Sequence, residues 1–372
     1  MHLTCTQPQL YSALQKVNRA IPPNSPIPSL TAVHLQATDA GLLSLTGTDL
    51  EFGVSVTISA EVFTPGQALI PARIFTDLIR HLPPVELTLK HDEAGGEIIQ
   101  ISTANSRINL NGMDTSQYPE LPRTKENVKF EIPINLLQEG IKLVSIAAGS
   151  EEINNVFHSI LWEIDNENLN LVATDTHRLA FFTKKIEKPI ESQKILIPSR
   201  ALNELVRLLP SEQEKVTIGV GDSYVYFEVN NLFLYSRIVA GQFPQYQQVI
   251  PQGFNTRAQV KTKDLQEAIE RAVVITREET KTRSYVIKIR VEHNLNISSQ
   301  AEQIGNLEEN VEALVEGPPL EMIINGRYLL DVLRVFPEEE INLEFLTSLK
   351  PVIIRPVERN NYFCLILPIK TR

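Results

Sequence analysis

The feature that most constrains this chain is one short pattern that occurs three times at a fixed spacing. Arg73, Arg200 and Arg327 lie 127 residues apart, and each is followed by an acid four residues on, a second arginine seven residues on and a proline ten residues on. Solenoid repeats have periods of about 20–50 residues, so a period this long indicates whole domains in tandem. The 372 residues therefore predict three similar domains. We place their boundaries at 1–120, 127–246 and 249–372.

Each copy of the pattern is predicted to be a short amphipathic helix. In the first copy Phe75, Leu78, Ile79 and Leu82 recur at the spacing of one helical face, and proline ends the helix. The two arginines and the acid fall on the opposite face. Another apolar-periodic helix opens each unit, and alternating strands follow, so we expect each domain to be α+β with two helices and antiparallel sheets.

The charge of the chain is unevenly distributed. Its 45 acids outnumber its 35 lysines and arginines, giving −10, which by itself argues against a nucleic-acid partner. The six predicted helices together carry a net positive charge, so the remainder is more negative than the total. Such a distribution would repel DNA from the remainder and tolerate it along the helices. A charged stripe on an amphipathic helix is more often only a solvated face, and both interpretations stay open at this point.

The sequence offers little for catalysis. No nucleophile, phosphate-loop, dinucleotide or metal-ligand motif is present, so we expect no cofactor and no metal. Asp175, His177 and Arg178 could suggest acid–base chemistry, but an isolated Asp-x-His is more often a turn held by side-chain hydrogen bonds. Cys5 and Cys364 form no disulfide framework, and no secretory or membrane-spanning segment is visible, so we expect a cytoplasmic protein.

Several longer motifs point to a family. They are TGTDLE at 46–51, PAR at 71–73, VATDTHRLA at 172–180, GQFPQY at 241–246 and the closing Leu367-Pro368. With them the chain resembles, over its full length, the bacterial sliding clamps, which are the β subunits of DNA polymerase III. The resemblance implies the DNA-clamp fold: three topologically similar domains, each with two inner helices and outer antiparallel sheets, in a head-to-tail dimer that forms a six-domain ring. The size of the domains, about 35 Å across, supports the dimer. Three such domains in a closed triangle would leave almost no hole, whereas six in a hexagon would leave a hole about one domain wide, which accommodates a DNA duplex.

The resemblance also implies the function. It implies a non-catalytic processivity factor that encircles duplex DNA without sequence preference and tethers the replicative polymerase by a peptide-binding pocket. The implied partners are double-stranded DNA, the polymerase III catalytic subunit, the clamp-loader complex and other proteins with a clamp-binding motif, with no membrane. The alternative is an acidic three-domain scaffold that binds peptides without encircling DNA.

Three sets of site residues follow from the resemblance and the helix patterns. The DNA-facing set is Lys16, Arg19, Arg73, Arg80, Lys142, Arg200, Arg207, Arg271, Arg277, Arg327 and Arg334. The peptide pocket is Phe157, Thr174, Thr176, His177, Arg178, Leu179, Pro244, Val249, Leu365, Leu367, Pro368 and Ile369. The dimer interface is Arg107, Ile108, Leu110, Val274, Ile275, Glu308, Glu309 and Glu312. Thr176 replaces a glycine that is frequent in the family, and Phe157 and Gln248 also depart from its pattern, so the preferred peptide stays open.

Overall fold

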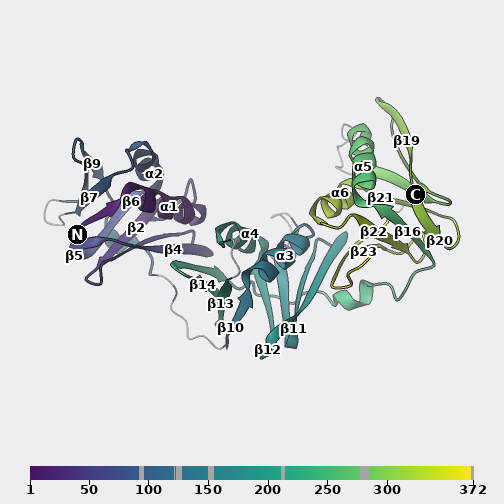
Figure 1. Cartoon of the computed structure of the whole chain (residues 1–372), viewed down its shortest axis with the longest axis horizontal. Helices are drawn as coiled ribbons and strands as arrows, with labels where there is room; N and C mark the ends of the chain where they lie inside the picture. The colour runs from purple at the N-terminus through teal and green to yellow at the C-terminus, as the bar shows by residue number, and fades with distance from the viewer. Residues whose placement is uncertain are drawn as a thin grey trace. The chain divides into compact units, whose positions relative to one another are not determined.

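The computed structural model divides into two compact units (Figure 1). It describes residues 1–91, 96–120, 122, 128–149, 155–210, 214–276 and 285–369. One unit comprises Met1–Asn135 with Arg207–Ile238, and the other Leu136–Val206 with Val239–Arg372.

The described residues form six α-helices, which pair two by two. The pairs are α1 (Gln7–Val17) with α2 (Ala72–His81), α3 (Ile134–Ser145) with α4 (Ser199–Leu208), and α5 (Thr262–Thr276) with α6 (Gly326–Val335). The predicted amphipathic faces are confirmed: in α2, Phe75 and Ile79 are fully buried while Arg73 and Arg80 are exposed. The side-chain amide of Gln7 donates to the carbonyl of Ile79 across the first pair (2.7 Å).

The repeat of sequence is also a repeat of structure. In each domain the first helix is tied to the end of the loop that follows the second helix. The backbone N–H of the first residue of α1, α3 or α5 donates to a backbone carbonyl, and that carbonyl belongs to the residue just before the next strand. These bonds run from Gln7 to Val85 (2.9 Å), from Ile134 to Glu214 (2.9 Å) and from Thr262 to Glu339 (2.8 Å). Three topologically similar domains are therefore present, and the boundaries assigned to them above stay a prediction.

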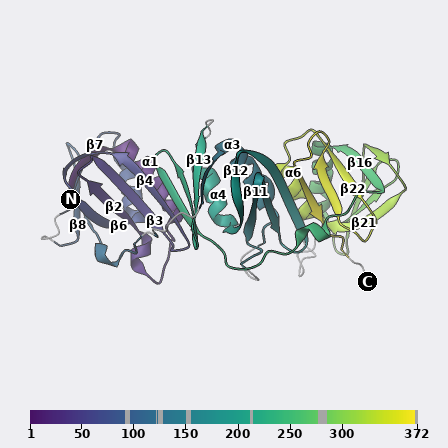
Figure 2. The same ribbon diagram turned by 90° about the horizontal axis from the view of Figure 1, so that it is seen from below.

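The first unit contains two antiparallel sheets, and strands of both are labelled in Figure 2. The five-stranded sheet has the order β5 (Glu61–Thr64), β1 (His2–Thr6), β7 (Glu86–His91), β8 (Ile98–Ser102) and β9 (Arg107–Asn111). The eight-stranded sheet has the order β10 (Val128–Pro133), β13 (Lys215–Val220), β14 (Tyr224–Val229), β15 (Leu232–Arg237), β4 (Phe52–Ser59), β3 (Leu42–Thr48), β2 (Ala32–Thr38) and β6 (Gly66–Pro71).

The second unit also contains two antiparallel sheets. The seven-stranded sheet has the order β11 (Ser159–Thr174), β12 (Arg178–Pro198), β24 (Tyr362–Ile366), β23 (Val352–Pro356), β22 (Glu340–Phe345), β16 (Thr256–Lys261) and β20 (Ala313–Glu316). The four-stranded sheet has the order β19 (Gly305–Val311), β18 (Leu295–Ala301), β17 (Val286–Val291) and β21 (Leu320–Asn325).

Two of these sheets continue from one domain into the next. Strand β15 of the second domain pairs with β4 of the first, with Ser236 opposite Phe52. Strand β24 of the third domain pairs with β12 of the second, with Ile366 opposite Arg178. Each joint therefore uses the last strand of one domain and the strand after a Thr-Asp turn in the preceding domain. No helix in the described part of the chain is long and apolar enough to cross a membrane.

Candidate peptide pocket and DNA-facing helices

The turn between β11 and β12 is held by its own side chains. Thr174 Oγ1 donates to the carbonyl of Arg178 (2.6 Å) and accepts the N–H of Thr176 (3.2 Å). Asp175 Oδ1 accepts the backbone N–H groups of His177 (2.9 Å) and Arg178 (3.0 Å). The carboxylate is thus occupied in fixing the turn, which confirms the turn interpretation of the Asp-x-His motif.

The first domain repeats this turn between β3 and β4. Thr48 Oγ1 accepts the N–H of Leu50 (2.9 Å), and Asp49 Oδ1 accepts the N–H of Phe52 (2.8 Å). The third residue of the motif lies in the left-handed region in both turns, with φ of 77° at Leu50 and 76° at Thr176. A residue with a branched Cβ is strained in this region.

Replacing Thr176 with glycine should raise the free energy of unfolding by about 1 kcal/mol. The left-handed conformation costs an L-residue about 1–2 kcal/mol, and glycine avoids this cost. Glycine is also more flexible in the unfolded chain, and this offsets about 0.5–1 kcal/mol of the gain in stability. Urea denaturation followed by circular dichroism measures the change. Thr176→Ala keeps a Cβ and is the matched control, expected to gain less than glycine. A destabilised glycine variant would contradict the strain argument.

An apolar cluster from the second and third domains adjoins this turn. Its buried members are Val156, Leu161, Val172, Leu179, Leu196, Tyr246, Ile353 and Leu365, and Phe181, Val239, Phe243, Ile250 and Phe363 pack against them half-buried. Two residues of the predicted pocket, Leu179 and Leu365, belong to it and are each 2% exposed. The half-buried apolar side chains that pack over this buried core, with a few polar groups beside them, suit a short peptide with large apolar side chains.

The other predicted pocket residues surround the cluster to different depths. Thr174 is buried; Phe157, Arg178, Pro368 and Ile369 are half-buried; Thr176, His177, Pro244, Val249 and Leu367 are exposed. The backbone N–H of Leu367 donates to the carbonyl of His177 (2.9 Å), which brings the end of the chain to the turn. Ile369 is bonded instead to Ile323 on β21 (2.8 Å), so it lies on the third domain's other sheet.

Arg178 connects the turn to helix α6. Its Nε lies 2.9 Å from Asp175 Oδ2, and its Nη1 lies 2.7 Å from Asp331 Oδ2. The guanidinium carbon lies 4.3 Å from the ring centre of Tyr328, a cation–π distance. Burial, and next the Asp175 charge, raise the pKa of Tyr328. Sequence reasoning missed Tyr328 and Asp331, because the helical spacing places Asp331 on the charged face of its helix and predicts no contact for it with Arg178.

Glu163 anchors Tyr246 of the cluster. The Tyr246 hydroxyl donates to Glu163 Oε2 (2.8 Å), and Lys194 Nζ lies 2.6 Å from Glu163 Oε1. Burial favours the neutral acid, but the Lys194 and Tyr246 donors outweigh it and hold the pKa of Glu163 below its ordinary value. Burial and the hydrogen bond to Glu163 raise the pKa of Tyr246, so the phenol stays protonated and keeps donating.

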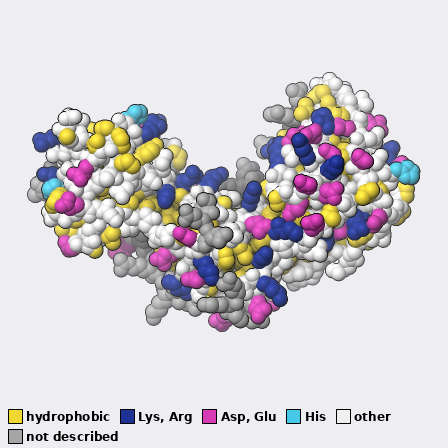
Figure 3. Space-filling view, viewed as in Figure 1, with side chains coloured by type: hydrophobic (Ala, Val, Ile, Leu, Met, Phe, Trp, Pro, Cys, Tyr) yellow, Lys and Arg dark blue, Asp and Glu magenta, His cyan; other side chains and the backbone are white. Residues whose placement is uncertain are grey.

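The described DNA-facing candidates are exposed, except Lys16, which is half-buried. Arg277 lies outside the described residues. Several of these cations have acidic neighbours in their own domain: Arg271 Nε donates to Glu309 Oε2 (2.9 Å), and Arg334 Nη2 lies 3.2 Å from Glu270 Oε1. Figure 3 shows basic and acidic side chains interspersed over the domain that carries α5 and α6. The faces of α5 and α6 are therefore only weakly basic.

The cysteines are placed away from reactive chemistry. Cys5 and Cys364 are both buried, and burial raises the pKa of each thiol to about 12. Among the residues that the structure describes, no three His, Cys, Asp or Glu side chains gather as metal ligands do.

Comparison with known proteins covers the whole chain. Family models of the DNA polymerase III beta subunit match its N-terminal domain at residues 1–122, its central domain at 131–245 and its C-terminal domain at 247–370. The chain is 30% identical to the beta sliding clamps of Bacillus subtilis and Staphylococcus epidermidis, with all of each chain covered. The crystal structure of the Bacillus subtilis clamp superposes with a TM-score of 0.95 over the full length of both chains. A Pseudomonas aeruginosa clamp bound to griselimycin, 25% identical, superposes with a TM-score of 0.93, again over all of both chains.

Proposed function

The chain belongs to the DNA polymerase III β-subunit family, the bacterial sliding clamps, and on that premise we propose how it holds DNA and its partners. As a sliding clamp it is a non-catalytic processivity factor of DNA replication, so the scaffold that does not encircle DNA is not favoured. We propose a cytoplasmic head-to-tail homodimer that encloses the duplex and binds partner peptides on the apolar cluster beside the 174–178 turn.

The observation that carries the dimer is the repeated joint between sheets. Strands β9, β15 and β24 are each the last of three strands that follow the second helix of a domain. Strand β15 pairs with β4, and β24 pairs with β12. By their order within the domain, β4 and β12 correspond to β19 in the third domain. Among the described residues β9 pairs only with β8, and β19 only with β18. Open strand edges invite pairing, and a two-fold axis would join β9 of each subunit to β19 of the other at both ends at once.

The side chains on these two edges differ in kind. Ile108 and Leu110 are half-buried on β9, and Arg107 is exposed beside them. Glu308 and Glu309 lie on β19, but Arg271 of the same chain already holds the Glu309 carboxylate. The contact should therefore depend on backbone pairing and apolar burial more than on ion pairs across it.

We propose that the helices contact DNA only weakly, because their cations are few and separated. The exposed arginines that open α2, α4 and α6 recur once per domain, so each subunit would offer the duplex a few separated cations. Dense phosphate contacts would bind tightly with a steep salt dependence, whereas a ring that retains DNA topologically needs none. The apolar cluster would tether the polymerase III catalytic subunit, the clamp loader and other motif-bearing proteins, raising their effective concentration at the primer end.

The clamp should stay on a closed DNA circle and leave a linear one. The test loads the protein on nicked circular DNA with a cognate clamp loader, linearises the circle and follows the bound fraction by gel filtration. The matched variant Ile108→Asp with Leu110→Asp should run as a 41.9 kDa monomer in light scattering and fail to be retained on the circle. Retention on linear DNA would contradict a topological link, and retention of a monomeric variant would contradict the ring.

A further inference from the structure

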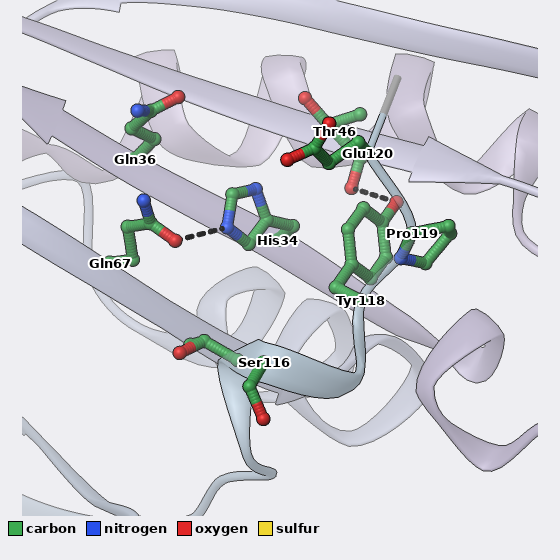
Figure 4. Close-up of a pocket in the computed structure, with 9 residues that line it drawn as sticks. His34, Gln36, Thr46, Gln67, Ser116, Tyr118, Pro119 and Glu120 are labelled. Carbon is green, nitrogen blue, oxygen red and sulfur yellow. Dashed lines mark hydrogen bonds between the residues drawn. The ribbon is translucent and has the colours of Figure 1, made fainter. Parts of the chain in front are cut away.

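The first domain contains a cavity of about 490 Å³ on the face of β2, β3 and β6 (Figure 4). It is lined by His34, Gln36, Thr46, Gln67, Thr115, Ser116, Tyr118, Pro119 and Glu120. Neither the DNA-facing helices nor the predicted dimer edge contributes a residue to it. The cavity therefore needs an explanation of its own.

Strand pairing shows that this cavity occupies the position of the part of the apolar cluster around Leu161 and Val172 in the second domain. Gln36 faces Gln67 in the β2–β6 pair, and Glu163 faces Lys194 in the β11–β12 pair. Both partners are displaced by the same 127 residues that separate the copies of the helix pattern. By the same offset, His34 of the cavity corresponds to Leu161 of the apolar cluster.

The neighbouring turn and the strand from the next domain correspond as well. Arg237 donates its N–H to the carbonyl of Glu51 (2.8 Å), just as Leu367 donates to His177 (2.9 Å). The pair Tyr118-Pro119 at the cavity rim corresponds to Phe243-Pro244 beside the apolar cluster. Two domains thus build one architecture, formed by a Thr-Asp turn, a strand from the following domain and an aromatic-proline rim.

The chemistry of the two positions differs. Val172 of the cluster is replaced by Thr46, and Leu161 by His34. In the cavity His34 Nε2 lies 3.2 Å from Gln67 Oε1, and the imidazole stacks on Tyr118 with ring centres 4.9 Å apart. The Tyr118 hydroxyl in turn donates to the carbonyl of Thr46 (3.3 Å). These bonds, seen in Figure 4, give the first-domain cavity a fixed polar floor.

The charge of the lining points to a cationic ligand. None of the nine lining residues is lysine or arginine, and Glu120 supplies a carboxylate that is exposed at the rim. Burial lowers the pKa of His34, so its ring is neutral near pH 7. An ammonium or guanidinium group at the rim would gain a charge-assisted hydrogen bond, and a carboxylate would be repelled.

We propose that this cavity is a second peptide site, which takes a short segment of a partner protein carrying a lysine or arginine side chain for Glu120. The choice of a peptide rests on the proposed function, because the equivalent position in the second domain is the one proposed to bind partner peptides. The two positions would then bind different partner segments: the apolar cluster would bind apolar side chains, and the first-domain cavity would bind basic side chains.

Disulfide tethering tests the proposal on the full chain. Ser116→Cys places an exposed thiol in the lining, while the native Cys5 and Cys364 are buried with a pKa of about 12 and stay unreactive. The probes are the disulfides of acetyl-Cys-Gly-Lys-amide, acetyl-Cys-Gly-Leu-amide and acetyl-Cys-Gly-Glu-amide, equilibrated against mercaptoethanol and quantified by mass spectrometry. We expect the lysine peptide to exceed the leucine peptide about tenfold in exchange constant, with the glutamate peptide lowest.

Two controls decide the source of any preference. Glu120→Gln in the Ser116→Cys chain should abolish the lysine preference, which separates Glu120 from the nearby Asp114, whose Oδ1 lies 2.9 Å from the Ser116 amide. Thr64→Cys, exposed on β5 of the same domain, reports the general attraction of the acidic chain for lysine. The second site is overturned if the lysine preference is as large at Thr64→Cys as at Ser116→Cys, or if Glu120→Gln leaves it unchanged. A preference for the leucine peptide at Ser116→Cys also overturns it. The circular-DNA assay uses no tether, so its failure overturns the proposed function separately.

Discussion

Replacing Val249 and Leu367 together with alanine should weaken the binding of a clamp-binding peptide about 100-fold and leave the free energy of unfolding nearly unchanged. Both side chains are exposed, 48% for Val249 and 37% for Leu367. Both flank the apolar cluster: Val249 precedes Ile250, and the backbone of Leu367 is bonded to the turn. Truncating an apolar contact at the centre of an interface costs about 1–2 kcal/mol of binding energy, and two such losses give about two powers of ten.

The folded chain should hardly register these changes, because exposed side chains contribute less than about 0.5 kcal/mol to stability. Calorimetric titration with a synthetic peptide from the cognate polymerase III catalytic subunit measures the affinity. Leu314→Ala is the matched control, since Leu314 is 71% exposed on β20 and lies outside the cluster. An affinity loss no larger than that of the control would place the pocket elsewhere.

The helices and the domain repeat could be predicted from sequence because both depend on local periodicity. The apolar spacing around Phe75 recurs around Leu202 and Leu329, and all three side chains are fully buried. The joints between sheets could not be predicted in this way. Alternation in Leu232–Arg237 indicates a strand, but its partner Phe52–Ser59 lies in another domain, and many alternating strands offer the same pattern. Register between such strands is decided by packing, which a single sequence does not reveal.

The candidate site shows the same division. The Thr-Asp turn was predictable because its side chains bond to the backbone two to four residues away. The link from Arg178 to Asp331 joins residues 153 positions apart, and helical spacing shows only that Asp331 lies on the charged face of its helix. The first-domain cavity was missed for a related reason: its lining comes from strands β2, β3 and β6 and the segment at 115–120, and no one of them carries a recognisable motif.

Replacing Arg178 with methionine should lower the free energy of unfolding by about 3 kcal/mol. The side chains of Arg178 and Asp175 are only 12% and 13% exposed, and that of Asp331 is 28% exposed. Methionine keeps the bulk of the stem but leaves two carboxylates facing each other without their cation. Breaking a buried ion pair by removing one partner costs about 3–5 kcal/mol, and the partial exposure of Asp331 places this site at the lower end.

A double-mutant cycle separates this network from an ordinary surface pair. Asp331→Asn in the Arg178→Met chain should restore part of the lost stability, because it removes one of the two unpaired charges, and the coupling between the sites should be about 1–2 kcal/mol. Arg237→Met is the matched control, since the Arg237–Glu51 pair beside the corresponding turn is 58% and 62% exposed and should cost less than about 1 kcal/mol. Because Arg178 also fixes the turn that holds Leu367, its loss should weaken peptide binding as well. If Arg178→Met and Arg237→Met cost the same stability, the link to α6 would be no more than a surface contact.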